Sequence, residues 1–202
     1  MVSGYCEWMK DPFIQEMTST EEMSLDEHYQ IQKDYILKSN EQVIFLIMDL
    51  NSNQETQEQV SIQNLSNLIR LIQNHNKDQP ETKIDISKVK LIGDINLFLK
   101  RNNDDPLQGE LNIMIAEKQA QRKGLAQETI MLIMKYGAQK FGLTNYIAKI
   151  SMKNLASINL FKKLGFKVIE ELEVFEEIHF GKQVDEDILN KECKLYQTEI
   201  NQ

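Results

Sequence analysis

A short segment, Gln121–Ala126 (Gln-Arg-Lys-Gly-Leu-Ala), carries residues suited to holding an anion. It lies between a predicted strand and a predicted helix, and unpaired N–H groups at a helix N-terminus attract phosphate oxygens. Gly124 allows the backbone to approach a ligand closely, while Arg122 and Lys123 add positive charge. The segment indicates a pyrophosphate-binding loop, although a plain strand–helix turn uses the same residue types.

A second segment, Asn154–Phe166 (Asn-Leu-Ala-Ser-Ile-Asn-Leu-Phe-Lys-Lys-Leu-Gly-Phe), is typical of a short capped helix. Asn154 suits the N-cap, the lysines at 162 and 163 suit the last turn, and Gly165 suits the position after it. Capping alone accounts for most of this pattern.

Both segments resemble the cofactor motifs of the GNAT acetyltransferases. The first family motif, Gln/Arg-x-x-Gly-x-Gly/Ala, is matched by Gln121, Gly124 and Ala126. The second, Asn-x-x-Ser followed by Phe or Tyr and then Gly-Phe, is matched by Asn154–Phe166. The two motifs follow each other in the expected order, each on its expected element.

Three further strings, Tyr5–Lys10, Gly93–Leu99 and Gly109–Glu117, are similar to the N-acetyltransferase 9-like branch of this family. The resemblance covers most of the chain up to about Val174, apart from the stretch 51–83. It implies acetyl-CoA as donor and a protein amino group as acceptor, in that branch the N-terminal amines of tubulin. Microtubules are the implied partner, and the cytoplasm is the expected location.

The resemblance also implies a set of cofactor-binding residues. They are Met114, Ile115, Ala116, Gln121, Arg122, Lys123, Gly124, Leu125, Ala126, Asn154, Ser157 and Phe161.

The expected chemistry is direct transfer, in which an amine attacks the thioester carbonyl and the CoA thiolate leaves. A backbone N–H near Met114–Ala116 would polarise the carbonyl oxygen. A base is required because the amine is protonated at neutral pH. The candidates for this base are Glu110, Asp94 and Glu117; Ser157 and Tyr136 are the candidates for the acid.

Relatives carry an acidic residue where this chain has Asn112, which leaves the base open and keeps a rival hypothesis in view. In that hypothesis the chain is an inactive GNAT scaffold that binds microtubules. A third alternative is an acetyltransferase for a small amine. The three histidines are scattered, so no metal site is expected.

Hydrophobic patterning predicts the elements that position these residues. Apolar runs indicate strands at 43–48, 89–99 and 110–116, the last two forming a hairpin. Strand–helix alternation follows from 121 to 164, with closing strands at 166–174 and 175–180 and a possible last strand at 192–198. A capping box at Ser24 and Glu27 starts a helix that runs to about Lys38.

The fold class that follows is α/β: a GNAT fold with a mixed, mostly antiparallel sheet flanked by helices. We expect one domain over residues 1–202, with a polar insertion at about 51–83 that contains a short helix around 65–72. The family's first strand is expected to be missing, which leaves one sheet edge open or reflects a truncated gene model.

Composition excludes several classes of protein. The chain has 202 residues and a formal net charge of −8, which argues against nucleic acid as the main partner. Its apolar runs are too short to span a bilayer, so no membrane contact is expected.

Overall fold

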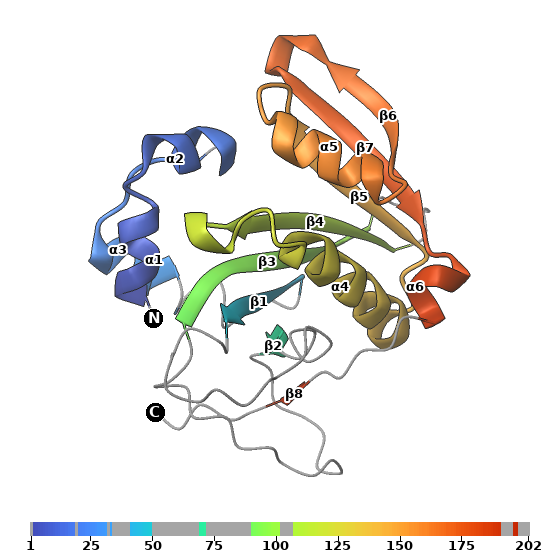
Figure 1. Ribbon diagram of the computed structural model, residues 1–202, viewed down its shortest axis with the longest axis horizontal. Coiled ribbons are helices and arrows are strands. Elements are labelled where there is room, and N and C mark those ends of the chain that lie inside the picture. Colours follow the sequence, from blue (N-terminus) through green and yellow to red (C-terminus); the bar gives the residue numbers. More distant parts are fainter. Residues whose placement is uncertain are drawn as a thin grey trace.

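The computed structural model describes residues 2–18, 20–31, 33, 41–49, 69–71, 90–101, 107–190 and 196–197. Its strands form one sheet in the order β6-β7-β5-β4-β3-β1-β2-β8 (Figure 1). The strands are β1 (Gln42–Asp49), β2 (Ile69–Leu71), β3 (Lys90–Lys100), β4 (Gln108–Ile115), β5 (Asn145–Ser151), β6 (Lys167–Leu172), β7 (Glu177–Gln183) and β8 (Tyr196–Gln197).

Neighbouring strands are antiparallel except β4 with β5 and β2 with β8, which are parallel. The mixed, mostly antiparallel sheet predicted from the sequence is therefore confirmed.

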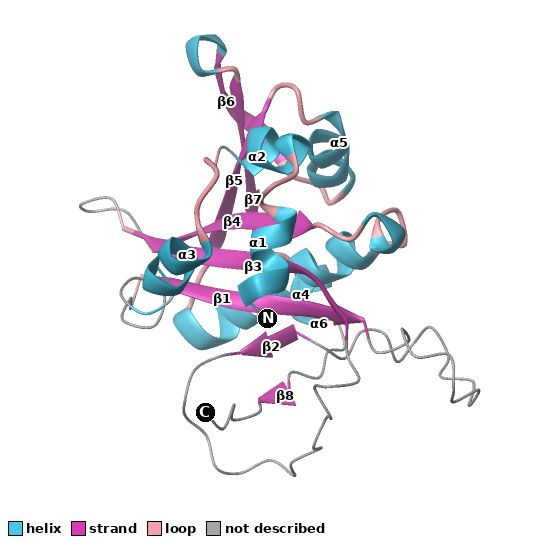
Figure 2. Cartoon of the chain, turned by 90° about the vertical axis from the view of Figure 1, so that its left-hand side faces the viewer, coloured by secondary structure: helices cyan, strands magenta, loops and turns pink. Residues whose placement is uncertain are grey.

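The helices divide into an N-terminal group and a group that follows the hairpin β3–β4 (Figure 2). The first group is α1 (Val2–Trp8), α2 (Pro12–Thr18) and α3 (Leu25–Ile31), and the second is α4 (Leu125–Phe141), α5 (Leu155–Lys163) and α6 (Glu186–Asn190). Two 3₁₀ turns, η4 (Lys118–Ala120) and η5 (Glu173–Phe175), complete the described elements. Figure 1 shows α1–α3 beyond one end of β3 and β4, with α4 lying along these strands.

The main core lies between α4, α5 and one face of the sheet. Alternate strand residues point into it, as the two-residue period of a strand requires. Its most buried members include Phe45, Ile95, Leu97, Leu111, Tyr146 and Phe180 from the strands, and Ile130, Ile133, Met134 and Phe161 from the helices. The other face of β3 and β4 is left for the N-terminal helices.

Local sequence signals place several element ends correctly. The Ser24 backbone N–H donates to Glu27 Oε2 at 2.7 Å and the Glu27 N–H donates to Ser24 Oγ at 3.3 Å, which completes the predicted capping box. Gly142 ends α4 at φ 68°. Most of the expected extension of the α3 helix to Lys38 falls outside the described residues.

The insertion is where the prediction was wrong. A helix was expected around residues 65–72, but Ile69–Leu71 forms β2, which pairs antiparallel with Phe45–Ile47 of β1. The apolar residues there fit either period, and the open hydrogen-bonding edge of β1 favours the strand. β8 extends this edge in parallel. The edge beside β1 is therefore paired over these residues.

A bulge interrupts β3 next to Gly93. Ile47 pairs with Gly93 but Met48 pairs with Leu91, so Ile92 is the extra residue. A Cβ on Gly93 would collide with the Met114 carbonyl oxygen of β4, so glycine permits this close strand approach.

Gly137 of α4 offers a test of the packing between α4 and the sheet. A Cβ there would collide with the Tyr146 hydroxyl, which donates to the Met134 carbonyl oxygen at 2.6 Å. We expect Gly137→Ala to lower the free energy of unfolding by roughly 1–3 kcal/mol, as overpacking does. Urea denaturation measures this value. Gly4→Ala in α1, where the Cβ would meet nothing within 4 Å, is the matched control and should be neutral or slightly stabilising.

Candidate active site

The central feature of the site is the divergence of two neighbouring strands. β4 and β5 pair over only three positions, Gln108–Glu110 with Asn145–Ile147. Beyond them the paired register ends, while β4 continues to Ile115 along β3. Figure 1 shows the two strands parting toward the end at which α1–α3 lie. A segment of β4 therefore has a neighbouring strand on one side only.

The hydrogen-bond alternation of an antiparallel pair shows which β4 groups face β5. The Ala116 N–H donates to the Ile92 carbonyl at 2.9 Å, so it is engaged within the hairpin. Antiparallel pairs alternate, and Met114 therefore turns its N–H toward β3 as well. Ile113 and Ile115 turn theirs toward the parting strands. Of the expected segment 114–116, Ile115 alone presents its N–H to the gap.

The predicted phosphate loop lies at the end of this β4 segment. The Gln121 side-chain amide donates to the Ile115 carbonyl oxygen at 2.8 Å and ties the loop to the strand. Arg122 (φ 61°) and Gly124 (φ 82°) both adopt the left-handed conformation. Alternating handedness of this kind turns successive N–H groups toward one point and forms an anion-binding concavity.

The start of α4 supplies further donors to this point. The Glu128 N–H makes the first bond of the helix, to the Gly124 carbonyl at 3.0 Å. The backbone N–H groups of the residues before Glu128, among them Leu125 and Ala126, have no acceptor within the helix. Arg122 and Lys123 are exposed and bring positive charge to the same end. The geometry suits a pyrophosphate, and these residues fit a CoA-type cofactor.

The second motif is explained in large part by helix capping. The Asn154 side chain accepts from the Ser157 backbone N–H at 3.0 Å, as an N-cap does. Phe161 is 2 % exposed and packs edge to face on Phe166 with ring centres 4.9 Å apart. Ser157 lies in α5, which packs on the core face of the sheet. Asp94 and Glu110 point to the opposite face, so the structure does not bring Ser157 together with them.

Asp94 is the most strongly perturbed carboxyl group among the described residues. It is 5 % exposed, and burial raises its pKa to about 7, while a hydrogen bond from Asn96 partly opposes the rise. The Asn96 side-chain amide donates to Asp94 Oδ2 at 2.9 Å. Asp94 points away from the main core because Ile95 points into it. It therefore faces the N-terminal helices.

The N-terminal helices cover Asp94 with aromatic residues. Burial, and secondarily the charge of Asp94, raises the pKa of the Tyr5 phenol. The Tyr5 ring packs edge-on to His28 of α3 with ring centres 5.8 Å apart and lies 6.2 Å from the Trp8 ring. Tyr5 thus lies near enough to Asp94 for the charge of this carboxyl group to act on the phenol.

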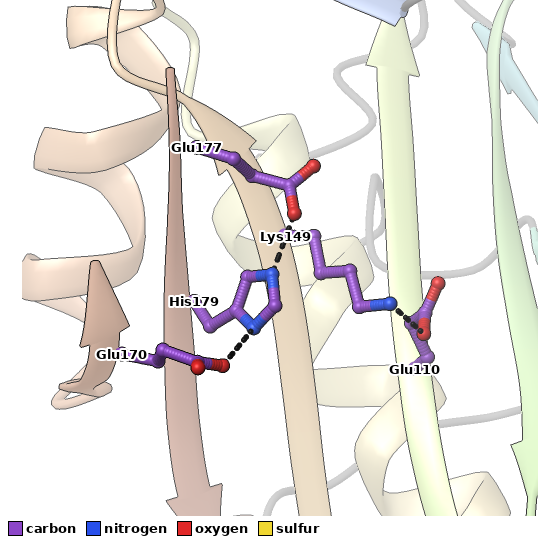
Figure 3. A network of polar contacts seen from close by, with 5 residues as sticks. All are labelled: Glu110, Lys149, Glu170, Glu177 and His179. Atoms are coloured by element: carbon purple, nitrogen blue, oxygen red, sulfur yellow. Dashed lines mark hydrogen bonds and ion pairs between the residues drawn. The ribbon is translucent and has the colours of Figure 1, made fainter. Parts of the chain in front are cut away.

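Glu110 occupies the point at which the strands part. Its Oε2 lies 3.4 Å from Lys149 Nζ, so an ion pair joins the last paired residue of β4 to a β5 residue just beyond the paired segment (Figure 3). Next to Lys149, His179 of β7 contacts two carboxylates, Glu170 at 3.2 Å and Glu177 at 2.5 Å. Glu110 is therefore already engaged in an ion pair with Lys149.

Glu117 has a structural role. Its Oε2 accepts from Lys90 Nζ at 2.6 Å and its Oε1 accepts from the Trp8 indole N–H at 3.1 Å. These hydrogen bonds, the Lys90 bond first, lower its pKa. Glu117 joins α1 to the end of β4 immediately before the phosphate loop, and a carboxylate engaged in this way is not the base that was expected. The Tyr136 ring packs between Phe45 and Phe141 on the core side, and its buried hydroxyl has no hydrogen-bond partner among the described residues.

Comparison with known proteins agrees with this geometry. A model of the acetyltransferase (GNAT) domain matches residues 2–167. The chain belongs to the GNAT acetyltransferase family. The resemblance of the Gln121–Ala126 and Asn154–Phe166 motifs to that family is thereby confirmed.

Curated GNAT relatives extend the match over most of the chain. The mouse protein named alpha/beta-tubulin-N-acetyltransferase 9 is 32% identical over 185 residues, covering 92% of this chain and 65% of that protein. A Dictyostelium discoideum N-acetyltransferase 9-like protein is 32% identical over 179 residues, covering 88% of this chain and 74% of its own length. The chain thus spans slightly less than two thirds of the mouse protein.

Solved structures show the same GNAT fold. Spermidine N-acetyltransferase from Vibrio cholerae, solved in complex with CoA and spermine, superposes with a TM-score of 0.61 at 16% identity. This match covers 90% of this chain and 89% of that one. An aminoglycoside acetyltransferase in complex with coenzyme A gives 0.58 at 12% identity, covering 90% and 88% of the two chains.

The described residues contain neither a membrane-spanning helix nor a metal-binding cluster. No helix there is long and apolar enough to cross a membrane. No group of three or more histidine, cysteine or acidic side chains is arranged there to hold a metal ion.

Sequence reasoning missed two residues of this GNAT site. Asn96 was read only as part of a strand, although its place two residues from Asp94 puts both side chains on one face. Lys149 carried no signal, because its partner Glu110 is brought beside it by parallel pairing of β4 and β5.

Replacing the buried carboxyl should stabilise the protein in a pH-dependent way. The folded pKa of about 7 exceeds the ordinary 3.8, so the folded state holds the proton more tightly. Stability from Asp94 is complete below about pH 4 and is lost as the pH rises through 7. The full rise corresponds to on the order of 4 kcal/mol. Asp94→Asn should therefore raise the free energy of unfolding at pH 8 far more than at pH 4.

Urea denaturation at both pH values measures this difference. Glu171→Gln serves as the control, since it removes one negative charge from an exposed position and leaves the buried residues unchanged. A stability gain from Asp94→Asn that is equal at pH 4 and pH 8 would show that Asp94 is not a buried, shifted carboxyl group.

Proposed function

We propose that this chain is an acetyl-CoA-dependent N-acetyltransferase that acetylates protein amino groups, chiefly N-terminal amines. The observation that carries the proposal is the parting of β4 and β5, with the phosphate loop at its end and a carboxyl of raised pKa on the next strand. This arrangement provides a place for the donor and a proton acceptor for the amine.

The donor is assigned to the parted strands and the loop. The loop from Gln121 to Ala126, with its two left-handed residues, receives the pyrophosphate. The pantetheine arm lies along β4 and uses the backbone groups that face β5. The Ile115 N–H polarises the thioester carbonyl, since a preorganised donor is most effective where charge develops. Acetyl-CoA supplies the acetyl group as a bound thioester.

Proton transfer is assigned to Asp94. A general base works best when its pKa is near the operating pH, and burial raises the pKa of Asp94 to about 7. The amine loses its proton toward this carboxylate, attacks the thioester carbon and displaces the thiolate. Positioning of the two substrates supplies much of the remaining rate.

The acceptor class follows from the relatives and from the charges of the acceptor side. Proteins named alpha/beta-tubulin-N-acetyltransferase 9 suggest a protein amine, and tubulin is the first candidate, in the cytoplasm. Glu110, Glu170 and Glu177 lie together near the parting of the strands and favour a cationic substrate (Figure 3).

A scaffold without turnover remains the second candidate. Asn112 is exposed on the acceptor side of β4, at the position where an acid was expected from relatives. Binding of acetyl-CoA without acetyl transfer to any amine would favour this scaffold.

Introducing a negative charge into the phosphate loop tests whether the loop binds the pyrophosphate. Gly124 and Gly142 cap opposite ends of α4, both have positive φ, and a Cβ at either would meet nothing within 4 Å. The left-handed conformation costs the same side chain roughly 1–2 kcal/mol at either position. We expect Gly124→Glu to weaken acetyl-CoA binding more than tenfold by repelling the pyrophosphate, while Gly142→Glu binds as the unaltered protein does. Calorimetry measures both dissociation constants; equal weakening would place the cofactor elsewhere.

The proposed base also predicts which amine is used. An α-amine titrates at about 7.7–8.0 and a lysine side chain at about 10.4, so a base with a pKa near 7 deprotonates the α-amine far more readily. A tubulin N-terminal peptide that contains one lysine should be acetylated at its α-amine first. Mass spectrometry of the product locates the acetyl group. Preferential acetylation of the lysine would contradict the proposed acceptor class.

A further inference from the structure

Two buried polar atoms without hydrogen-bond partners lie on the face of β3 that points away from the main core. Among the described residues, four buried side-chain atoms lack a hydrogen-bond partner. Two of them, Asp94 Oδ1 and Asn96 Oδ1, belong to neighbouring side chains on one face of β3, and a third is His28 Nε2 of α3. Leaving a buried polar atom unpaired costs about 1–3 kcal/mol, so their concentration calls for an explanation.

The pairing of Asp94 with Asn96 leaves a defined arrangement of acceptors. The Asn96 amide N–H donates to Asp94 Oδ2, so this carboxylate oxygen is occupied. The other Asp94 oxygen and the Asn96 amide oxygen remain, and when Asp94 is ionised both act only as hydrogen-bond acceptors. Two adjacent free acceptors, one of them charged, fit a cationic donor group and repel an anion.

The surroundings further restrict the ligand. Leu46 of β1 and Met114 of β4 flank Asp94 in the sheet, and neither carries a charge. Tyr5 of α1 lies near Asp94, and the ring of His28 packs edge-on against the Tyr5 ring. The nearest charged pair at this end, Lys90 with Glu117, is already satisfied. A small ammonium group, with its N–H donors, matches the site.

We propose that Asn96 is the positioning residue for the acceptor: it holds one oxygen of Asp94 and, with its own amide oxygen, orients the substrate ammonium toward the other. This inference rests on the proposed acetyltransferase function and deepens it. The acceptor class is a primary amine that enters as its ammonium form. Both free oxygens are buried, so neighbouring side chains must move for the amine to reach them.

The proton balance of the step follows from these contacts. One ammonium proton passes to Asp94 Oδ1 while a second N–H stays bonded to Asn96 Oδ1. The freed nitrogen lone pair forms the C–N bond and the C–S bond breaks. After the C–N bond forms the nitrogen carries two protons: one passes to the CoA thiolate and the other stays on the product amide. Asp94 returns its own proton to solvent.

Removing the Asn96 amide is the experiment that separates positioning from packing. Asn96→Leu keeps a similar volume and loses the donor that stabilises the Asp94 carboxylate. The acid limb of the kcat/KM profile, and the Asp94 carboxyl titration followed by ¹³C NMR, should both move to higher pH by roughly one unit. At pH 7 this corresponds to about a fivefold loss of kcat/KM.

Further readouts sharpen this experiment. The KM for the amine peptide should rise in Asn96→Leu while calorimetric acetyl-CoA binding stays unchanged. Asn96→Thr restores a hydroxyl donor and should recover part of the titration shift. Asn190→Leu, at the exposed end of α6 and outside both cofactor motifs, is the control and should change neither profile nor KM.

The possible failures are distinguishable. If Asn96→Leu lowers kcat/KM equally at every pH and Asp94 titrates as in the unaltered protein, Asn96 only packs and the inference is overturned. If the unaltered protein binds acetyl-CoA but acetylates no amine, the proposed function fails, and the NMR titration still decides whether Asn96 controls the ionisation of Asp94.

Discussion

The parting of β4 from β5 is the constraint on which the rest of the site depends. Parallel pairing stops at Glu110, so β4 keeps hydrogen-bonding groups that β5 does not use. A sheet with unused groups in its middle requires either another strand or a ligand. The site therefore depends on how its elements are placed along β4. Gln121 ties the phosphate loop to Ile115, and Glu117 ties α1 to the same end of the strand.

The acceptor side shows a conflict between stability and function. Asp94 is buried, and its Oδ1 and the Asn96 Oδ1 have no hydrogen-bond partners, so the pair destabilises the folded chain at neutral pH. Apolar residues at these positions would destabilise it less. Proteins retain such groups at functional sites, where their perturbed ionisation is used. On the other side of the sheet the same strand contributes Ile95 and Leu97 to a fully apolar core. β3 thus supports folding with one face and chemistry with the other.

Much of the fold was predictable because its signals are local. Asn154 caps α5, Gly142 ends α4, and alternating apolar residues mark β3 and β4. The errors lie where pairing acts over distance. Ile69–Leu71 became a strand because the edge of β1 was available, and Glu117 proved structural because Trp8 lies 109 residues away in sequence. The phosphate loop was recognisable as a motif, but the Asp94–Asn96 pair required the knowledge of which face is buried.

Amide hydrogen exchange with and without acetyl-CoA tests the central claim most directly, that the donor lies between the parted strands. Exchange reports the protection of individual N–H groups. The account predicts slower exchange on adding acetyl-CoA at Ile113, Ile115 and the loop residues 122–126, with Met114 and Ala116 unchanged because β3 already engages them. Unchanged exchange at Ile113 and Ile115, or protection confined to another part of the chain, would contradict it.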